Sequence, residues 1–128
     1  LLPGQLARAS EPLDQRRRLG NEKDEIRAVN DQFGSSVWTR DLALAIKSLI
    51  EDESPSGIYH LVNEASASWF DIASEIISIT EGKARVLPVP GTTYPRKATV
   101  PKNSALANTK RPLLRPWKEA LSEYLRQA

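Results

Sequence analysis

The sequence predicts an α/β fold, a small helix-rich lobe built around a short sheet. Apolar residues recur at helical spacing in two windows, near residues 39–53 and 69–80. Three short runs, at residues 25–29, 58–62 and 86–90, have the alternation, β-branched content or proline pattern typical of extended segments. Because three short segments can form only a small sheet, we expect helices to dominate.

Length and composition indicate one domain or a piece of one. The chain has 128 residues, of which 40% are hydrophobic and 27% charged, as in a soluble globular protein. The absence of cysteine excludes a disulfide scaffold and fits a cytoplasmic protein. No apolar run is long enough to span a membrane. Since the sequence begins with Leu1 and holds no methionine, we expect it to be a piece of something larger.

The first half of the chain predicts a strand, a polar turn and a helix. Residues 1–24 match no clear element, because prolines interrupt their apolar spacing, and we treat them as a helix or loop segment before a lobe at 25–128. Charged and apolar side chains alternate over 25–29, which predicts a strand. A helix is expected from about Thr39 to Glu53, with Asp41 in its first turn, where a negative charge suits the helix dipole.

The middle of the chain predicts a strand, a loop and a second helix. Residues 58–62 are expected to be a buried strand, followed by a loop at 63–66. Ser68 and Asp71 are spaced as a capping box, with Asp71 in the third helical position, so a helix should follow and end near Glu81.

The last third is richer in proline. Residues 86–90 should form an edge strand and 91–102 an irregular loop. One or two turns of helix are expected at 103–110, and Pro116 is expected as the first residue of a final helix.

Charge is distributed unevenly along the chain. Between Glu81 and Glu119 there is no acidic residue, although this window holds nine of the eighteen lysines and arginines. Such a segment favours an anionic ligand, for example a nucleotide diphosphate, or a nucleic acid. A solvated basic surface is the competing interpretation.

Several catalytic signatures are missing from the sequence. The six glycines form neither a dinucleotide fingerprint nor a phosphate-binding loop, and no tyrosine is followed four residues later by lysine. The single histidine, His60, falls in a predicted strand, where a hydrogen-bonding role in the core or a cleft is more common than catalysis. No second histidine or cysteine supports a metal site.

Six stretches, in this order, resemble the C-terminal half of the dTDP-4-dehydrorhamnose reductase family, within the extended short-chain dehydrogenase/reductase superfamily. Residues 29–35 read Val-Asn-Asp-Gln-Phe-Gly-Ser and are followed by Asp-Leu-Ala at 41–43. The other matching stretches are 57–61, 68–71, 94–95, 101–104 and 116–125. Together they cover the chain from about Ile26 to Leu125.

The resemblance implies the substrate-binding lobe of an oxidoreductase. The family reduces the 4-keto group of dTDP-4-dehydro-L-rhamnose to give dTDP-L-rhamnose for cell-surface polysaccharide. It implies NADPH or NADH as the cofactor, held by an N-terminal Rossmann half that is absent from this sequence, with a magnesium ion as a further candidate. The expected partners are therefore a dTDP-sugar, the missing Rossmann half and, through an exposed apolar face, a second copy of the chain. No membrane is expected as a partner. Alone, this chain should be inactive.

The candidate substrate-binding residues follow from the polar turn, the single histidine and the basic segment. They are Gln32, Ser35, His60, Arg96, Lys97, Lys102, Asn103 and Ser104. Each has a plainer alternative: Gln32 and Ser35 close the turn, the cations are exposed loop residues, and Asn103 and Ser104 cap a short helix. Trp38 has two readings as well, stacking on a ligand or packing beside the helix.

Three departures from the family pattern leave a second function open. Ser36 and Val37 replace a Pro-Thr pair, Thr99 and Val100 replace a basic pair, and Ala107 replaces an Asp or Asn. These changes fit a non-catalytic binding or regulatory module, of which the regulatory subunit of methionine adenosyltransferase is an example in the superfamily. Nucleic-acid binding ranks third, because no known nucleic-acid module is present.

Overall fold

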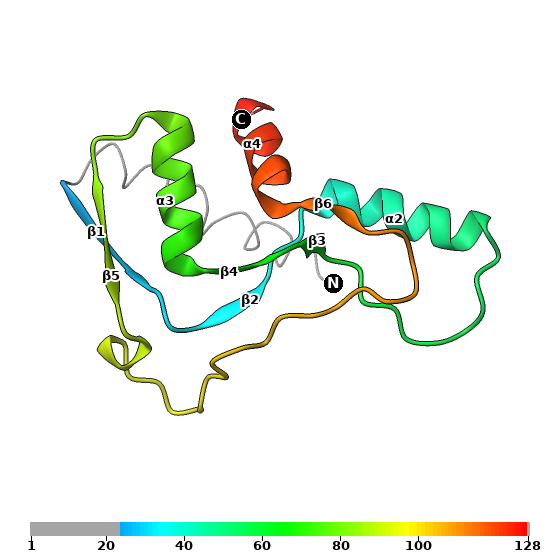
Figure 1. The fold of residues 1–128 in the computed structure, drawn as a ribbon, viewed down its shortest axis with the longest axis horizontal. Coiled ribbons are helices and arrows are strands. Elements are labelled where there is room, and N and C mark those ends of the chain that lie inside the picture. Colours follow the sequence, from blue (N-terminus) through cyan, green and yellow to red (C-terminus); the bar gives the residue numbers. More distant parts are fainter. Residues whose placement is uncertain (1–23, 128) are drawn as a thin grey trace.

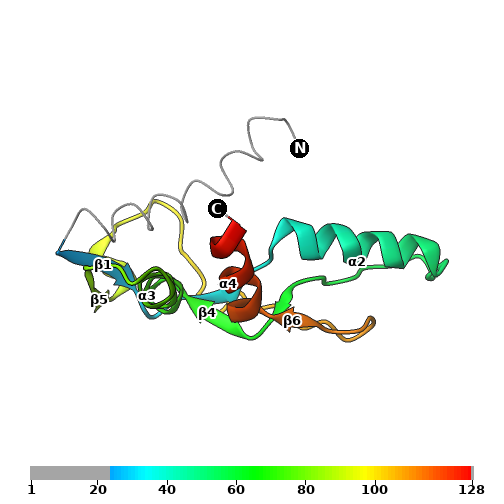
Figure 2. The same cartoon turned by 90° about the horizontal axis from the view of Figure 1, so that it is seen from above.

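The computed structural model describes residues 24–127, so the expectation for residues 1–23 lies outside the described part of the chain. These residues form three α-helices, one turn of 3-10 helix (Gly91–Thr93) and six short strands, arranged as an elongated molecule (Figures 1 and 2). One end holds the helix α3 (Trp69–Thr80) with the strands β1 (Glu25–Val29) and β5 (Arg85–Val89). The helix α2 (Thr39–Glu51) projects from the other end.

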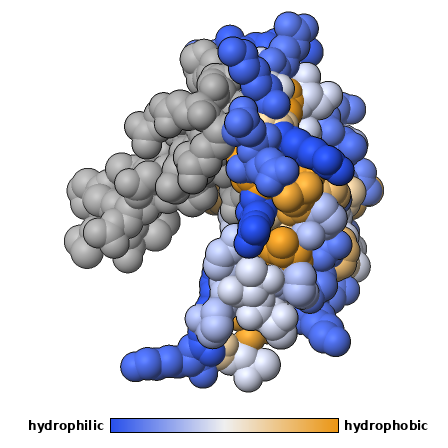
Figure 3. Space-filling view, turned by 90° about the vertical axis from the view of Figure 1, so that its left-hand side faces the viewer, coloured by the Kyte–Doolittle hydropathy of each residue, from blue (hydrophilic) through white to orange (hydrophobic). Residues whose placement is uncertain are grey.

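The strand β1 pairs in parallel with β5, in a register that places Ile26 opposite Val86 and Ala28 opposite Pro88. Both strands were predicted, and Pro88 is tolerated because each strand of a two-stranded sheet has a free edge. Ile26 and Ala28 face inward, where α3 packs on the sheet. Seen from this end, the surface is mostly hydrophilic, with separate hydrophobic patches (Figure 3).

The capping box that starts α3 is confirmed. The Ser68 hydroxyl accepts the Asp71 backbone N–H at 3.1 Å, and the Asp71 carboxylate accepts the Ser68 N–H at 2.8 Å and its hydroxyl at 2.9 Å. Two orphan N–H groups of the helix end are thereby satisfied. The helix ends at Glu81, which adopts a left-handed conformation with φ of 52°.

The core lies between α3 and the last helix, α4 (Trp117–Gln127). Its buried members come from one face of each helix and from the strand before α3: Ala67, Ile72, Ile76, Trp117, Leu121 and Leu125. Ile76 is fully buried. The final helix begins one residue later than predicted, because Pro116 is still the last residue of the strand β6 (Leu114–Pro116).

Two further strand pairs replace the single small sheet that the sequence suggested. The strand β2 (Phe33–Ser35) pairs antiparallel with β4 (Ser66–Ser68), and β3 (Asn63–Glu64) pairs in parallel with β6. The loop predicted at 63–66 is therefore wrong. The predicted polar turn is shorter than expected, because its second half is β2.

Two other predictions are wrong for the same physical reason. Residues 58–62 form no strand, and Ile58 is 75% exposed, because no described strand lies beside them. Residues 103–110 form no helix, because the backbone N–H of Ser104 donates to the Phe33 carbonyl at 2.8 Å instead of entering a helical turn. In both cases the available pairing partner, rather than local propensity, decided the conformation.

The helix α2 has the predicted amphipathic spacing but, among the described residues, none of its side chains is buried. Ile46 is 43% and Ile50 68% exposed. No helix in the described part of the chain is long and apolar enough to cross a membrane.

We expect Ser68→Ala to lower the free energy of unfolding by about 1 kcal/mol, because it removes the cap of α3. Urea denaturation followed by circular dichroism measures this. The matched control is Ser78→Ala, at an exposed position within the same helix, which should leave stability unchanged or slightly raised. Equal losses from both substitutions would contradict the capping role.

Candidate functional site

The turn at residues 31–35 is fastened to the loop at 102–106 by a set of hydrogen bonds. The Phe33 N–H donates to the Lys102 carbonyl and the Ser104 N–H donates to the Phe33 carbonyl, both at 2.8 Å. The Leu106 N–H donates to the Ser35 hydroxyl at 2.8 Å, and the Ser104 hydroxyl donates to the Phe33 carbonyl at 3.3 Å. Two segments about 70 residues apart in sequence are therefore joined into one wall.

The first half of the turn is hydrogen-bonded to the start of the loop at residues 91–102. The Gly91 N–H donates to the Asp31 carboxylate at 2.8 Å. A Cβ at Gly91 would lie 2.3 Å from the Gln32 Nε2, so only glycine lets the Gln32 amide lie so close to this backbone. Gln32 is therefore positioned by contact with residue 91.

A hollow of about 400 Å³ opens beside this turn, and we call it the polar hollow only because cationic and amide side chains are part of its lining. Gln32, Arg96 and Lys102 line it, together with Asp31, Tyr94 and Val100. Two cations and an amide in one concave surface suit a ligand with several anionic oxygens.

A second hollow, of about 360 Å³, lies against the other side of the turn and is largely apolar. Phe33 and Trp69, each 40% exposed, line it. Gln32 and Val100 line both hollows, so the two are contiguous. A polar and an apolar compartment that share one wall suit an extended ligand with a charged part and a ring.

The structure brings together six of the eight residues predicted from the sequence. Gln32, Arg96 and Lys102 line the polar hollow, and Ser35 and Ser104 line the apolar one. Asn103 lies in the same wall, beside Phe33. Lys97 is on the same loop but lines neither hollow. His60 is exposed on the segment that follows α2 and lines neither hollow.

Some of these side chains already have structural partners. The Ser35 hydroxyl accepts the Leu106 N–H, and the Asn103 side-chain oxygen accepts the Ala105 N–H at 3.0 Å. Ser35 therefore joins the turn to the loop at 102–106 and does not close the turn itself. Asn103 caps no helix, because none forms at 103–110, and its side chain instead bonds within the loop. Their contacts with a ligand stay predictions.

Asn63, which the sequence predicts in a loop, connects the residues that follow the turn to two other segments. Asn63 is 1% exposed. Its backbone N–H donates to the Ser36 carbonyl at 3.1 Å, while its side-chain oxygen accepts the Trp38 N–H at 2.8 Å. Its side-chain NH₂ donates to Asp41 at 2.8 Å and to the Arg115 carbonyl at 3.0 Å. The amide therefore joins three segments, and only its burial, which the sequence does not reveal, marks it.

Asp41 and Arg115 form a two-point ion pair next to Asn63. The Arg115 Nε and one terminal nitrogen each lie 3.0 Å from an oxygen of the carboxylate, and a second nitrogen contacts Glu123. The Asp41 side chain is only 12% exposed. Burial alone would raise the pKa of Asp41, but hydrogen bonds from Arg115 and Asn63 and the charges of Arg115 and Arg40 outweigh it, so the pKa is lowered.

Trp38 packs beside the helix in the same cluster. This favours the interpretation that it is a packing residue over the one in which it stacks on a ligand. The guanidinium groups of Arg40 and Arg115 lie 5.5 and 5.3 Å from its ring centre, and the Tyr124 ring meets it edge-on at 6.2 Å. Cation–π contacts of this kind keep the ring in place. Trp38 lines neither hollow beside the turn.

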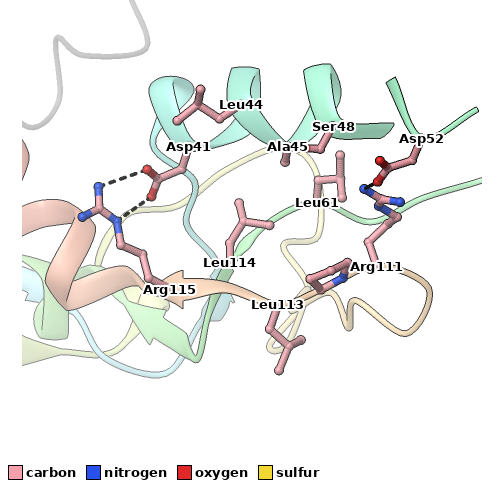
Figure 4. Close-up of a pocket in the computed structure, with 11 residues that line it drawn as sticks. Asp41, Leu44, Ala45, Ser48, Asp52, Leu61, Arg111, Leu113, Leu114 and Arg115 are labelled. Atoms are coloured by element: carbon pink, nitrogen blue, oxygen red, sulfur yellow. Dashed lines mark hydrogen bonds and ion pairs between the residues drawn. The ribbon is translucent and has the colours of Figure 1, made fainter. Parts of the chain in front are cut away.

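A third pocket, of about 410 Å³, lies between α2 and residues 111–115 (Figure 4). Leu61 and Leu114 point into it, and an ion pair closes each end, Asp41–Arg115 and Asp52–Arg111. Its charged groups are thus already paired with one another. An ionic ligand would therefore find fewer available charges here than in the polar hollow.

No group of three or more His, Asp or Glu side chains that could hold a metal ion occurs within residues 24–127. The magnesium ion implied by the resemblance therefore stays a prediction.

Comparisons with known proteins give the chain's relatives. The family described as "RmlD substrate binding domain" matches residues 11–128. The spore coat polysaccharide biosynthesis protein SpsK of Bacillus subtilis is 36% identical over 86% of this chain, and the dTDP-4-dehydrorhamnose reductase of Burkholderia thailandensis is 33% identical over 71%. The crystal structure of the Bacillus anthracis dTDP-4-dehydrorhamnose reductase in complex with NADP matches 90% of the chain with a TM-score of 0.82 and 33% identity.

The chain spans less than half the length of these proteins, namely 40%, 36% and 42%. The similarity therefore concerns one part of a longer polypeptide.

We expect Asn63→Ala to lower the free energy of unfolding by about 3 kcal/mol, because several buried groups lose their hydrogen-bond partner. Urea denaturation at pH 7 measures the loss. Asn103→Ala, which removes one exposed hydrogen bond, is the control and should cost less than about 1 kcal/mol. Similar losses of stability from both substitutions would contradict a particular stabilising role of the Asn63 hydrogen bonds.

Protonation of Asp41 should destabilise the protein in acid. Because its pKa is lower in the folded than in the unfolded state, its contribution is complete above its ordinary pKa of about 3.9 and is lost as the pH falls through the folded value. Asp41→Asn should therefore lower stability at pH 7 and weaken its pH dependence below about pH 4.

Chemical denaturation between pH 2 and 7 tests this expectation. Asp52→Asn removes a carboxylate that is 59% exposed and is the control, because it should keep the loss of stability in acid. An unchanged acid dependence in Asp41→Asn would contradict the role of the pair.

Proposed function

The chain belongs to the family of RmlD substrate binding domains, and on this premise we propose that it binds the sugar nucleotide in an NAD(P)H-dependent reductase. The full enzyme would reduce dTDP-4-dehydro-L-rhamnose to dTDP-L-rhamnose in the cytoplasm. The observation that carries the proposal is the pair of contiguous hollows around Gln32, one cationic and one apolar. A sugar nucleotide likewise joins a diphosphate to rings.

Each compartment has a role in this proposal. Arg96 and Lys102 bind the diphosphate oxygens, since charge-assisted hydrogen bonds are the stronger ones. The Gln32 amide, at the shared wall, hydrogen-bonds a polar group of the sugar. Phe33 and Trp69 offer ring surfaces to the less polar parts of the ligand. The lobe thereby fixes the position of the carbonyl that is to be reduced.

The nicotinamide cofactor does not fit the residues present. The sequence has no glycine-rich dinucleotide fingerprint, and the cations of the polar hollow lie on an irregular loop and not at a helix start. We therefore assign the cofactor to a part of the enzyme outside this chain. It follows that this chain alone is inactive.

A non-catalytic binding module is the second candidate function. Val100, at a place where the family pattern has a basic residue, lines both hollows. An apolar side chain there leaves fewer cations for a diphosphate. This candidate keeps ligand binding but predicts no turnover even when the chain is joined to a cofactor-binding half.

We expect the isolated chain to bind dTDP in isothermal titration calorimetry. Lys102→Ala should weaken binding about tenfold, because a hydrogen bond to a charged group contributes roughly 1.5–3 kcal/mol. Gly91→Ala should also weaken binding, because its Cβ would displace the Gln32 amide.

The control is Lys83→Ala, an exposed cation of the same basic segment that lines neither hollow. It should leave the dissociation constant unchanged within about twofold at fixed salt. Equal effects of the two lysines would indicate general charge attraction only. Reduction of the keto sugar by the chain alone would contradict the assignment of the cofactor elsewhere.

A further inference from the structure

Among the described residues that line the polar hollow, Asp31 is the only acid. It shares the hollow with the cations Arg96 and Lys102. Asp31 is exposed, and one oxygen of its carboxylate, Oδ1, accepts the Gly91 N–H at 2.8 Å. The other oxygen, Oδ2, has no hydrogen-bond partner within residues 24–127. The carboxylate is therefore bonded to the protein at one oxygen and available to a ligand at the other.

The charged groups of the polar hollow are not paired with one another. No ion pair in the part of the chain that the structure describes includes Asp31, Arg96 or Lys102. The acids of the pocket beside α2 differ, because each is paired with an arginine (Figure 4). One acid and two cations in the same hollow thus keep their charges for a ligand.

A carboxylate in this position has opposite effects on two classes of nucleotide. A free nucleoside diphosphate ends in a phosphate whose second pKa is about 6, so at pH 7 it carries roughly one negative charge more than the same diphosphate esterified to a sugar. The carboxylate repels this extra charge. A sugar hydroxyl, by contrast, donates a hydrogen bond to a carboxylate, and such charge-assisted bonds are the stronger ones.

The two cations by themselves would favour the more negative ligand. Arg96 and Lys102 attract the free nucleoside diphosphate more strongly than the sugar nucleotide. Within the described lining of the polar hollow, only Asp31 opposes this order. The relative affinity for the two ligands therefore measures what the carboxylate contributes.

We propose that Asp31 is a specificity-determining residue, which makes the polar hollow select a sugar nucleotide over a free nucleoside diphosphate. Its Oδ2 accepts a hydroxyl of the sugar, next to the diphosphate that Arg96 and Lys102 bind. A terminal phosphate in the place of the sugar meets the carboxylate and is disfavoured. This inference rests on the proposed function, in which the diphosphate lies in this hollow.

A purely structural role of Asp31 is the alternative. A Cβ at Gly91 would lie 3.2 Å from the Asp31 Oδ1 and 2.3 Å from the Gln32 Nε2, so these three residues are closely packed. Asp31→Asn separates the two roles, because an amide oxygen still accepts the Gly91 N–H while the negative charge is lost. Asp31→Ala removes both the charge and the bond.

The test compares the binding of dTDP and dTDP-L-rhamnose to the chain by isothermal titration calorimetry at pH 7 and fixed salt. The unsubstituted chain should bind dTDP-L-rhamnose about fivefold more tightly than dTDP. Asp31→Asn should weaken dTDP-L-rhamnose binding about tenfold, because a hydrogen bond to a charged group is lost. It should strengthen dTDP binding about threefold, because the repulsion is removed. The order of the two ligands is thereby reversed.

The matched control is Asp24→Asn, which removes the charge of an exposed acid that lines neither hollow. It should leave the ratio of the two dissociation constants unchanged within about twofold. If Asp31→Asn has no effect while Asp31→Ala weakens both ligands equally, Asp31 only orients the turn and the inference is overturned. An increase in dTDP affinity with Mg²⁺ that Asp31→Asn abolishes would also overturn it, because the carboxylate would then bind the diphosphate through the ion.

Failure of the proposed function gives a different result from failure of this inference. If neither dTDP nor dTDP-L-rhamnose binds the chain, the proposed function is contradicted. If both ligands bind and Asp31→Asn leaves the ratio of their dissociation constants unchanged, only the role of Asp31 is contradicted.

Discussion

The described structure depends most on one buried amide, that of Asn63. Its side chain uses its oxygen and both hydrogens, and its partners come from the start of α2, from Asp41 and from the strand before α4. A buried polar side chain is stable only when its hydrogen bonds are made. The hydrogen bonds of this amide therefore form only when three segments lie together. The Asp41–Arg115 ion pair connects two of the same segments. The direction of α2, which has no buried side chain among the described residues, is fixed mainly there.

The candidate site depends on a second long-range constraint, the pairing of Phe33 and Ser35 with the loop at 102–106. This pairing brings the cations of the irregular loop next to the Gln32 turn. It also explains why so many polar groups of the turn have protein partners. Gln32, Arg96 and Lys102 line the hollow beside the turn, and Gln32 also lines the second hollow.

The two ends of the molecule differ in how they are stabilised. The end with α3 and α4 has an apolar core around Ile76 and Trp117 and a full capping box, which suits independent folding. The α2 end is held by ion pairs and side-chain hydrogen bonds, and Leu44, Ile46 and Ile50 of its helix are exposed.

The elements whose signals are local could be predicted from the sequence. The alternation in β1, the apolar spacing of α2, α3 and α4, and the Ser68–Asp71 capping box depend on residues within a few positions of one another. The family resemblance and the choice of Gln32, Arg96 and Lys102 were also available at this level, because they rest on residue types in a fixed order.

Which backbone N–H and carbonyl groups found hydrogen-bond partners depended on the tertiary structure. Residues 58–62 have strand propensity but no neighbouring strand among residues 24–127, while residues 103–106 give up a helix to pair with β2. The position of His60 away from the two hollows and the hydrogen bonds of Asn63 likewise depend on which segments lie together in the fold. Pairing across 25 to 74 positions depends on which segments meet in space, and a short sequence window does not contain that information.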